Sequence, residues 1–292
     1  MLKHLTCALA LMAAPVFADT VTVETYTGPA EVPANPETIA VFDIAALDTL
    51  DALGVKPAGT IGNAYVDYLS TEGTETVGSL FEPDYEALAA LNPDLIIAGG
   101  RSAKVVPELA KLAPTIDMTI WEDTLGQSLD RLDAYGEIFD KQDEAAALKE
   151  KVDSKLAAAK EAASTAGSAL IVMTNGPKVS AYGSGGRFGW LHSAVGLPEA
   201  VEAVEQTTHG EAVSFEFIRD ANPDVLIVID RLAATGQEGA SAQSTLDNAL
   251  VQDTNAWKNG KVLYLDAARL YIAGGGIQAL MYTLDELTAG LK

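Results

Sequence analysis

The sequence predicts an α/β protein of two Rossmann-like lobes joined by a single long helix. Strands of the buried type alternate with amphipathic helices, as in parallel α/β sheets. A stretch in the first half, EALAALNPDLIIAGGR (residues 86–101), returns in the second half as EFIRDANPDVLIVIDR (residues 216–231), with Glu, Asn-Pro-Asp and Arg at one constant offset. Between the halves, residues 141–163 contain no Gly or Pro. At a rise of 1.5 Å per residue they predict a helix of about 35 Å.

The first 18 residues have the pattern of a secretory signal peptide. Lys3 gives a basic start, an apolar run covers residues 5–16, and a small residue, Ala18, precedes the predicted cleavage site. That run is too short to cross a bilayer, and no later segment is long and apolar enough. We therefore predict a periplasmic protein without a membrane span, cleaved after Ala18.

Composition excludes several classes of function. The formal net charge is −22 at pH 7, and removing the leader with its single lysine makes the remainder slightly more negative. Such a surface repels nucleic acid and anionic lipid. The only cysteine, Cys7, lies in the leader, which excludes thiol catalysis and cysteine metal sites in the mature chain. The predicted divisions are a leader (1–18), an N-terminal lobe (19–140), a connecting helix (141–163) and a C-terminal lobe (164–292).

The elements of the first half follow from hydrophobic periodicity and from Gly and Pro breaks. Residue Asn92 precedes a proline and so avoids the helical region, which ends the helix before it. In chain order we predict a strand over 19–33, a buried strand over 37–43, a helix over 44–55, a helix over 84–91 and a buried strand over 94–100.

The second half repeats this order after the connecting helix, for which Asp140 is a candidate N-cap. We predict a strand over 169–174, a helix over 187–197, a helix over 214–221, strands over 224–230 and 260–266, and a closing helix over 277–292. Parallel strands with right-handed crossovers are expected in both lobes. A single rigid linking helix predicts small movements of the lobes on ligand binding.

Three arginines are the candidate ligand-binding residues. Arg101 and Arg231 each follow a buried strand at its carboxyl end, where open α/β sheets bind ligands. Arg187 opens a helix after a Gly-rich turn that matches no phosphate-loop motif. The matched Glu86 and Glu216 lie on the preceding helices, displaced toward the outer surfaces of the two lobes.

His209 and Tyr271 are the candidate metal ligands. A polar loop carries the first and the end of a strand carries the second, so both can reach the cleft. Their nitrogen and phenolate oxygen can complete the coordination of a ferric ion that is otherwise bound by hard oxygens. We expect Arg131 and Arg219 to face solvent, Arg269 to be an outside candidate for the cleft, and His192 to be structural.

Several stretches together resemble one known family. These are IAVFDIAALDTLDALGV, PDYEALAALNPDLIIAGGR, GGRFGWLH, THGEAVSFEFIRDANPDVLIVIDR and LYIAGGG. They resemble the periplasmic binding proteins of ferric-siderophore ABC importers, particularly the catecholate-binding branch, over nearly the whole mature chain. The resemblance implies the helical-backbone periplasmic binding protein fold with a shallow cleft.

The resemblance also implies roles for individual residues. An arginine triad lining the cleft maps onto Arg101, Arg187 and Arg231. A pair that binds iron directly when the siderophore supplies only four donors maps onto His209 and Tyr271. Outer glutamates that dock on arginines of the membrane permease map onto Glu86 and Glu216.

We therefore expect a monomeric carrier that captures a ferric catecholate siderophore and delivers it to an inner-membrane ABC permease with its ATPase. The Fe(III) arrives within the ligand, and no intrinsic cofactor is expected. The alternatives are a carrier of haem or of another iron chelate, such as a hydroxamate, or of cobalamin, on the same fold, and a secreted hydrolase. The hydrolase is disfavoured because Ser184 lies in no GxSxG motif and the chain has no HExxH.

Overall fold

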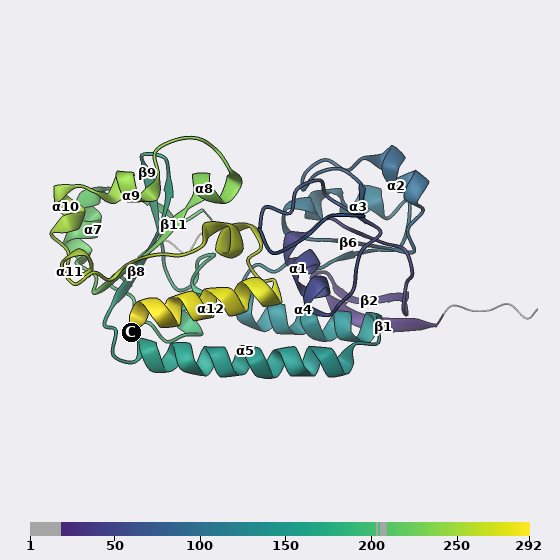
Figure 1. Ribbon diagram of the computed structural model, residues 1–292, viewed down its shortest axis with the longest axis horizontal. Coiled ribbons are helices and arrows are strands. Elements are labelled where there is room, and N and C mark those ends of the chain that lie inside the picture. Colours follow the sequence, from purple (N-terminus) through teal and green to yellow (C-terminus); the bar gives the residue numbers. More distant parts are fainter. Residues whose placement is uncertain (1–18, 203, 205–208) are drawn as a thin grey trace, which may run out of the picture.

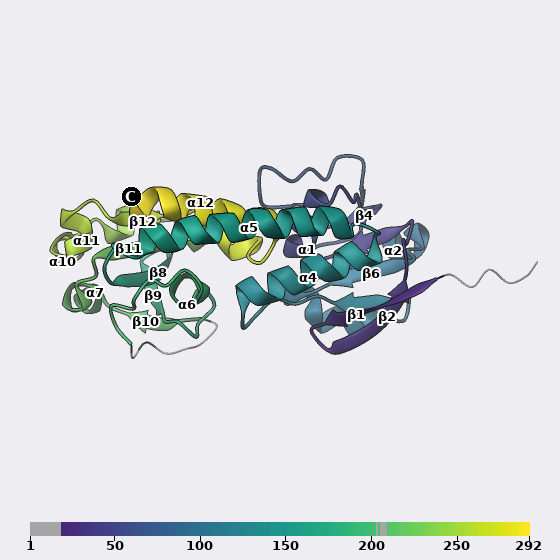
Figure 2. The same cartoon turned by 90° about the horizontal axis from the view of Figure 1, so that it is seen from below.

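The computed structural model describes residues 19–202, 204 and 209–292, so the predicted leader (1–18) lies outside the described residues. Two α/β lobes lie side by side, and a long helix, α5 (Gln142–Ala163), runs along both of them (Figures 1 and 2). None of the helices in the described ranges is long and apolar enough to cross a membrane.

The N-terminal lobe is built on an all-parallel sheet, as predicted. Its strand order is β5-β4-β3-β6-β7. These strands are β3 (Ile39–Val41), β4 (Gly59–Thr60), β5 (Glu75–Thr76), β6 (Leu95–Ala98) and β7 (Thr115–Asp117). The helices of this lobe are α1 (Ile44–Ala52), α2 (Tyr85–Leu91), the 3₁₀ helix η1 (Gly100–Val105), α3 (Val106–Leu109) and α4 (Thr124–Ile138).

The single strand predicted over 19–33 is instead a hairpin. Its strands β1 (Thr20–Thr25) and β2 (Gly28–Pro33) pair antiparallel outside the main sheet. The alternation that predicted one strand continues on both sides of the turn, because each strand buries one face. Periodicity alone therefore did not locate the turn.

The sheet of the C-terminal lobe is mixed, in contrast to the predicted parallel sheet. Its order is β10-β9-β8-β11-β12, in which β8, β11 and β12 are parallel to one another and β9 is antiparallel to both of its neighbours, β8 and β10. The strands are β8 (Ala169–Asn175), β9 (Lys178–Tyr182), β10 (Glu211–Val213), β11 (Val225–Asp230) and β12 (Val262–Tyr264). Two residues, Gly176 and Pro177, reverse the chain between β8 and β9, and Gly176 has φ of 58°, a left-handed conformation that two-residue hairpin turns require.

Short helices connect the strands of this lobe. The helix predicted over 187–197 forms only over four residues, because glycines at both ends of the segment interrupt it. The helices are α6 (Trp190–Ser193), α7 (Phe215–Ala221), α8 (Arg231–Thr235), α9 (Ala242–Leu246), α10 (Ala249–Gln252), α11 (Asn255–Lys258) and the π-helix η2 (Ala268–Ile272).

The sequence repeat has the same structure in both lobes. Asn92 and Asn222 end α2 and α7 in the left-handed conformation, with φ of 49° and 39°. Asp94 then accepts a hydrogen bond from the Thr38 N–H at 2.8 Å. In the other lobe Asp224 accepts one from the Ser168 N–H at 3.0 Å. Each aspartate thereby holds the start of the strand that follows it, β6 or β11, against the central strand of the sheet, β3 or β8.

The linking helix α5 begins after Asp140, but this residue does not cap it. Lys141 occupies the N-cap position without a side-chain cap, and Asp140 has a left-handed φ of 53°. The predicted apolar stripe of α5, which includes Leu148 and Val152, is buried. It packs on α4 and on the C-terminal helix α12 (Ile277–Leu291), and Lys155 pairs with Asp285 of α12 at 2.6 Å.

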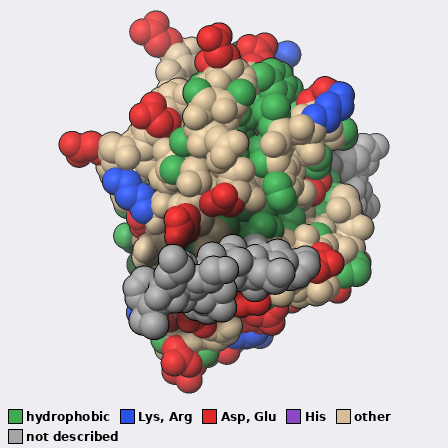
Figure 3. Space-filling model, turned by 90° about the vertical axis from the view of Figure 1, so that its right-hand side faces the viewer, with side chains coloured by type: hydrophobic (Ala, Val, Ile, Leu, Met, Phe, Trp, Pro, Cys, Tyr) green, Lys and Arg blue, Asp and Glu red, His purple; other side chains and the backbone are tan. Residues whose placement is uncertain are grey.

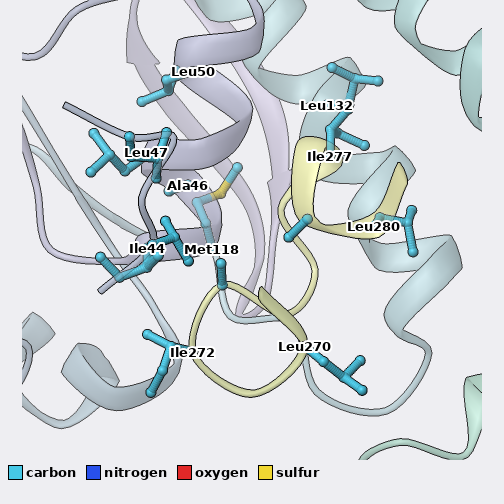
Figure 4. Close-up of a cluster of buried hydrophobic side chains, with 14 of the residues drawn as sticks. Ile44, Ala46, Leu47, Leu50, Met118, Leu132, Leu270, Ile272, Ile277 and Leu280 are labelled. Carbon is cyan, nitrogen blue, oxygen red and sulfur yellow. The ribbon is translucent and has the colours of Figure 1, made fainter. Parts of the chain in front are cut away.

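One hydrophobic core joins the two lobes. Helix α12 packs on α1 as well as on α5. Figure 4 shows its apolar side chains, together with those of η2, facing the core of the N-terminal lobe. The residues labelled there are Ile44, Ala46, Leu47, Leu50, Met118, Leu132, Leu270, Ile272, Ile277 and Leu280. The last helix of the chain therefore completes the first lobe.

Candidate functional site

A cavity of about 360 Å³ opens between the lobes. All five residues predicted to bind ligand or metal line it: Arg101, Arg187, Arg231, His209 and Tyr271. Arg101 and Arg231, which stand 130 positions apart at matching places in the repeat, thus line the same cavity. By contrast, Asp and Glu predominate among the charged side chains on the outer end of the N-terminal lobe (Figure 3).

Arg101 comes from the turn that follows β6. Gly100 has φ of 52°, a conformation that glycine adopts without strain, and this turn brings Arg101 into the cavity at the start of η1. Its guanidinium donates to the carbonyl of Tyr271 at 2.9 Å and to that of Ile272 at 3.3 Å. Arg101 therefore links the N-terminal lobe to η2.

Arg187 lies in the glycine-rich segment that follows β9. Its guanidinium donates to the Tyr271 carbonyl at 2.7 Å, and its central carbon lies 4.3 Å from the centroid of the Tyr271 ring. Two causes lower the pKa of Arg187 to about 10. The larger is burial, and the second is the neighbouring positive charge of Arg101. The side chain still carries its charge at neutral pH, with little water around it.

Arg231 follows β11 and begins α8. The side chain of Asp230 caps this short helix by accepting from the N–H groups of Leu232 and Ala233. Arg231 donates to the Tyr271 hydroxyl at 3.4 Å and to the Asn175 side chain at 3.3 Å. These hydrogen bonds are long and therefore weak, so the Arg231 donors can turn to a ligand at a small cost in free energy.

Tyr271 is the common partner of the three arginines. It lies in η2, a single π-helical turn of a type often found at functional sites. Burial alone would raise the pKa of its phenol. The Arg231 hydrogen bond and the positive charges of Arg187 and Arg101 outweigh burial, so that the pKa is lowered from its usual 10. The phenol of Tyr271 thus loses its proton more readily than that of an ordinary tyrosine.

His209 also lines the cavity and is exposed. The Tyr182 hydroxyl donates to its backbone carbonyl at 3.0 Å, which fixes the chain at this point. His192 is buried and its Nδ1 lies 2.9 Å from the Leu197 carbonyl, as expected for a structural residue. Within the described ranges no three His, Cys, Asp or Glu side chains are grouped so that they could hold a metal ion.

The other arginines differ in position from one another. Arg269 lines the cavity, stacks 4.2 Å from the Tyr282 ring centroid and pairs with Asp67. Arg219 pairs with a neighbouring aspartate at the surface, as expected. Arg131 was expected at the surface, but it is only 5% exposed and donates to the backbone carbonyl of Glu24 in β1. The expectation failed because α4 is covered by the unpredicted hairpin.

Sequence reasoning did not identify three further residues of the cavity. Asp43 caps α1 at the cavity wall, where burial raises its pKa although the Ala46 N–H and Arg101 act against this. Phe81 and Trp121 line the rim and are exposed. They stand in loops that carry no motif, so no sequence signal indicated them.

Glu86 and Glu216 lie outside the cavity. Each is exposed in the first turn of its helix, α2 or α7. These two helices lie toward opposite ends of the molecule in both views (Figures 1 and 2). The two glutamates are thus on the outer parts of the two lobes.

Comparison with known proteins gives consistent matches. The family model described as "Periplasmic binding protein" matches residues 39–268. The petrobactin-binding protein YclQ of Bacillus subtilis is 38% identical over 90% of this chain and 84% of its own. Its crystal structure superposes with a TM-score of 0.88, covering 94% of this chain and 99% of the other.

Two relatives from Vibrio species match to a similar extent. The ferric-anguibactin-binding protein FatB of Vibrio anguillarum is 31% identical over 93% of this chain and 88% of its own. The structure of the periplasmic catecholate-siderophore binding protein VctP of Vibrio cholerae has a TM-score of 0.85 and 30% identity. It covers 93% of this chain and all of the other.

Proposed function

The chain belongs to the periplasmic binding protein family, and from this premise we propose that it captures a ferric catecholate siderophore and delivers it to an ABC permease. Members of this family bind and carry their ligands, and the chain is a binding protein and not an enzyme. The matched relatives are named for petrobactin, anguibactin and catecholate siderophores. These names indicate the class of ligand for which the cavity should be tested first.

The observation that carries the proposal is the convergence of three guanidinium groups on one cavity. The chain has a formal net charge of −22, so a compact polyanion is repelled everywhere except where positive charge is concentrated. Arginine suits an iron–catecholate complex because guanidinium stays charged, donates several hydrogen bonds and stacks on aromatic rings. Arg187 already stacks on an aromatic ring in this way.

The iron is cargo in this proposal and arrives bound by the siderophore. A siderophore with six donors satisfies the ion completely. One with only four donors leaves two coordination positions open, for which the His209 nitrogen and the Tyr271 oxygen are proposed as ligands. The lowered pKa of Tyr271 supports this role, because the phenolate is the form that binds Fe(III).

Delivery requires a surface that the permease can recognise from outside. Glu86 and Glu216 are proposed to dock on basic residues of the permease, one from each lobe, while its ATPase acts on the other side of the membrane. Their equivalent places in the repeat support this pairing. We propose a monomer in the periplasm, exported by the leader that ends at Ala18.

Quenching of the intrinsic tryptophan fluorescence tests the proposal. The full mature chain is titrated with ferric complexes of a tris-catecholate, a bis-catecholate, a hydroxamate and citrate, and separately with haemin. We expect the tightest binding for a catecholate complex, with a broad visible charge-transfer band in the complex. A Soret band with haemin and no binding of catecholates would instead identify a haem carrier.

A further inference from the structure

Two aromatic side chains at the rim of the cavity are exposed although they are large and apolar. Phe81 is 63% exposed and Trp121 is 41% exposed. Both line the cavity, and both come from the N-terminal lobe. Of the aromatic residues that the C-terminal half places in the cavity lining, Tyr182, Phe188 and Trp190 are buried, and Tyr271 is partly buried. The two aromatic rings of the lining that are exposed therefore both come from the N-terminal lobe.

The loop that carries Phe81 is a tight and well-bonded turn. Gly78 pairs with Pro83 across it, and the Ser79 N–H donates to the Glu82 carbonyl at 2.9 Å. The Ser79 hydroxyl in turn accepts from the Phe81 N–H at 3.3 Å. Gly78 has φ of 120°, and a Cβ there would lie 2.4 Å from the Glu82 carbonyl oxygen, so the turn requires glycine. Phe81 is thus held out by a rigid backbone.

The segment that carries Trp121 is fixed by a side chain of α4. The Gln127 side-chain oxygen accepts from the Trp121 N–H at 2.6 Å and from the Glu122 N–H at 3.3 Å. The backbone is therefore held in place while the indole ring remains exposed. Within the part of the chain that the structure describes, neither Phe81 nor Trp121 contacts another ring or a stacked cation.

We propose that Phe81 and Trp121 form an aromatic half-site that packs against the catechol rings of the ligand. The proposal rests on the proposed function and adds a division of roles. The arginines recognise the charge of the complex, which any anionic iron chelate shares. The half-site recognises the aromatic rings, which catecholates carry and hydroxamates and citrate lack. It selects aromatic over non-aromatic chelates of equal charge.

Burial of apolar surface gives this selection its free energy. Two large exposed rings lose contact with water when a flat catechol ring covers them, and aromatic pairs gain further from edge and face geometry. A chelate without rings covers them poorly and gains little. The rigid turns keep the entropic cost of the contact low, because the backbone is already ordered.

Two substitution-inert probes of equal charge and similar shape separate the two roles. These are the chromium(III) tris-catecholate and the chromium(III) tris-oxalate complexes, kept under argon and titrated by calorimetry. We expect the native chain to prefer the tris-catecholate. Phe81→Ala and Trp121→Ala should each weaken tris-catecholate binding about five- to tenfold and leave tris-oxalate binding unchanged. Trp121→Phe, which keeps a ring, should retain most of the affinity.

The controls are exposed tyrosines outside the cavity. Tyr26 is 41% exposed and Tyr264 is 37% exposed, so Tyr26→Ala and Tyr264→Ala should change neither affinity. Thermal unfolding of each variant confirms that it is folded. Equal losses for both probes, no loss for either, or equal binding of both probes by the native chain would overturn the half-site while leaving the carrier function intact. Failure of the native chain to bind either probe or any ferric catecholate would overturn the proposed function itself.

Discussion

The two lobes share their local design but differ in what they contribute to the cavity. Both end a short helix at a left-handed asparagine, hold the next strand with an aspartate, and place an arginine after that strand. After β3, the first strand of its main sheet, the N-terminal lobe continues into the buried helix α1, whereas the C-terminal lobe turns back after β8 into a hairpin. The repeated part sets the scaffold, and the differing parts set the chemistry.

This difference divides the ligand contacts unequally. The C-terminal half supplies Arg187, Arg231, His209 and Tyr271, and so most of the charge and all of the candidate iron ligands. The N-terminal lobe supplies one arginine and the exposed rings. In the proposed function, recognition of charge therefore rests mainly on the C-terminal half and recognition of aromatic rings on the N-terminal lobe, and separate substitutions can test each part.

The largest expected effect is the loss of siderophore affinity when an arginine of the cavity is replaced. Arg187→Gln should weaken binding of a ferric tris-catecholate about 100-fold, because a hydrogen bond to a charged group contributes about 1.5–3 kcal/mol and this one is well shielded from water. Arg101→Gln and Arg231→Gln should each cost about tenfold. Fluorescence titration measures all three. Arg219→Gln, which changes a surface arginine, is the control. Equal losses of affinity for every variant would contradict the special role of the three cavity arginines.

The next largest effect on affinity is expected at Tyr271, which contacts all three arginines. Tyr271→Phe should weaken a tetradentate ferric siderophore about tenfold and a hexadentate one little, since only the former leaves iron positions open. Equal loss for both would exclude direct coordination.

The lowered pKa of Tyr271 adds a second readout for the same residue. Because the phenol loses its proton below its usual value, the phenolate absorbance of native protein minus Tyr271→Phe should rise at a lower pH than that of an ordinary tyrosine. The titration is done without ligand, so that it reports the arginines alone. A normal titration curve would contradict the charge arrangement described for this residue.

A smaller effect is expected on delivery, in which the two lobes should behave alike. Glu86→Lys and Glu216→Lys should each reduce uptake through the reconstituted permease several-fold and leave siderophore affinity unchanged. Glu150→Lys on α5 is the matched control. Loss from only one of the two glutamates would show that the lobes do not dock equivalently.

The smallest effect is on stability and tests the repeated aspartates. Asp94→Ala and Asp224→Ala should each lower the free energy of unfolding by about 1 kcal/mol, since hydrogen bonds to a partly exposed carboxylate are screened by solvent. Asp224→Ala should cost more, because Asn255 also donates to Asp224. Urea unfolding measures both.

The pKa of Asp224 is lowered by the Ser168 N–H and by Asn255, which gives this carboxylate a defined pH dependence. Its stabilisation is complete above the pKa it has in the unfolded chain and is lost as the pH falls through the lowered folded value. The difference in unfolding free energy between the native chain and Asp224→Ala should therefore shrink in acid. A constant difference would show that the carboxylate charge does not contribute.

The repeat made much of the fold predictable from sequence. Asn-Pro-Asp ends a helix and starts a buried strand, so α2, β6, α7 and β11 were placed correctly. The arginines after those strands could be assigned to the cavity edge by the topology of α/β sheets. Tyr271 and His209 rested on the family resemblance, and their roles as iron ligands stay predictions.

The errors have a common physical cause. Where the local sequence pattern is compatible with more than one structure, contacts between distant parts of the chain decide which one forms. The β1–β2 hairpin interrupts an alternation that continues on both sides of its turn. Arg131 has the sequence environment of a surface helix, yet the hairpin covers it. Phe81 and Trp121 carry no motif, and only the folded chain shows that they lie on the cavity.

The position of α12 has a consequence for synthesis. The first lobe lacks part of its interior until residues 277–291 have been made, because their apolar side chains complete it. A chain that has been made only as far as β12 cannot finish that lobe, although all of the lobe's own strands are already present. The order of the elements thus makes the first lobe depend on a segment that is synthesised more than 100 residues after its last strand, β7.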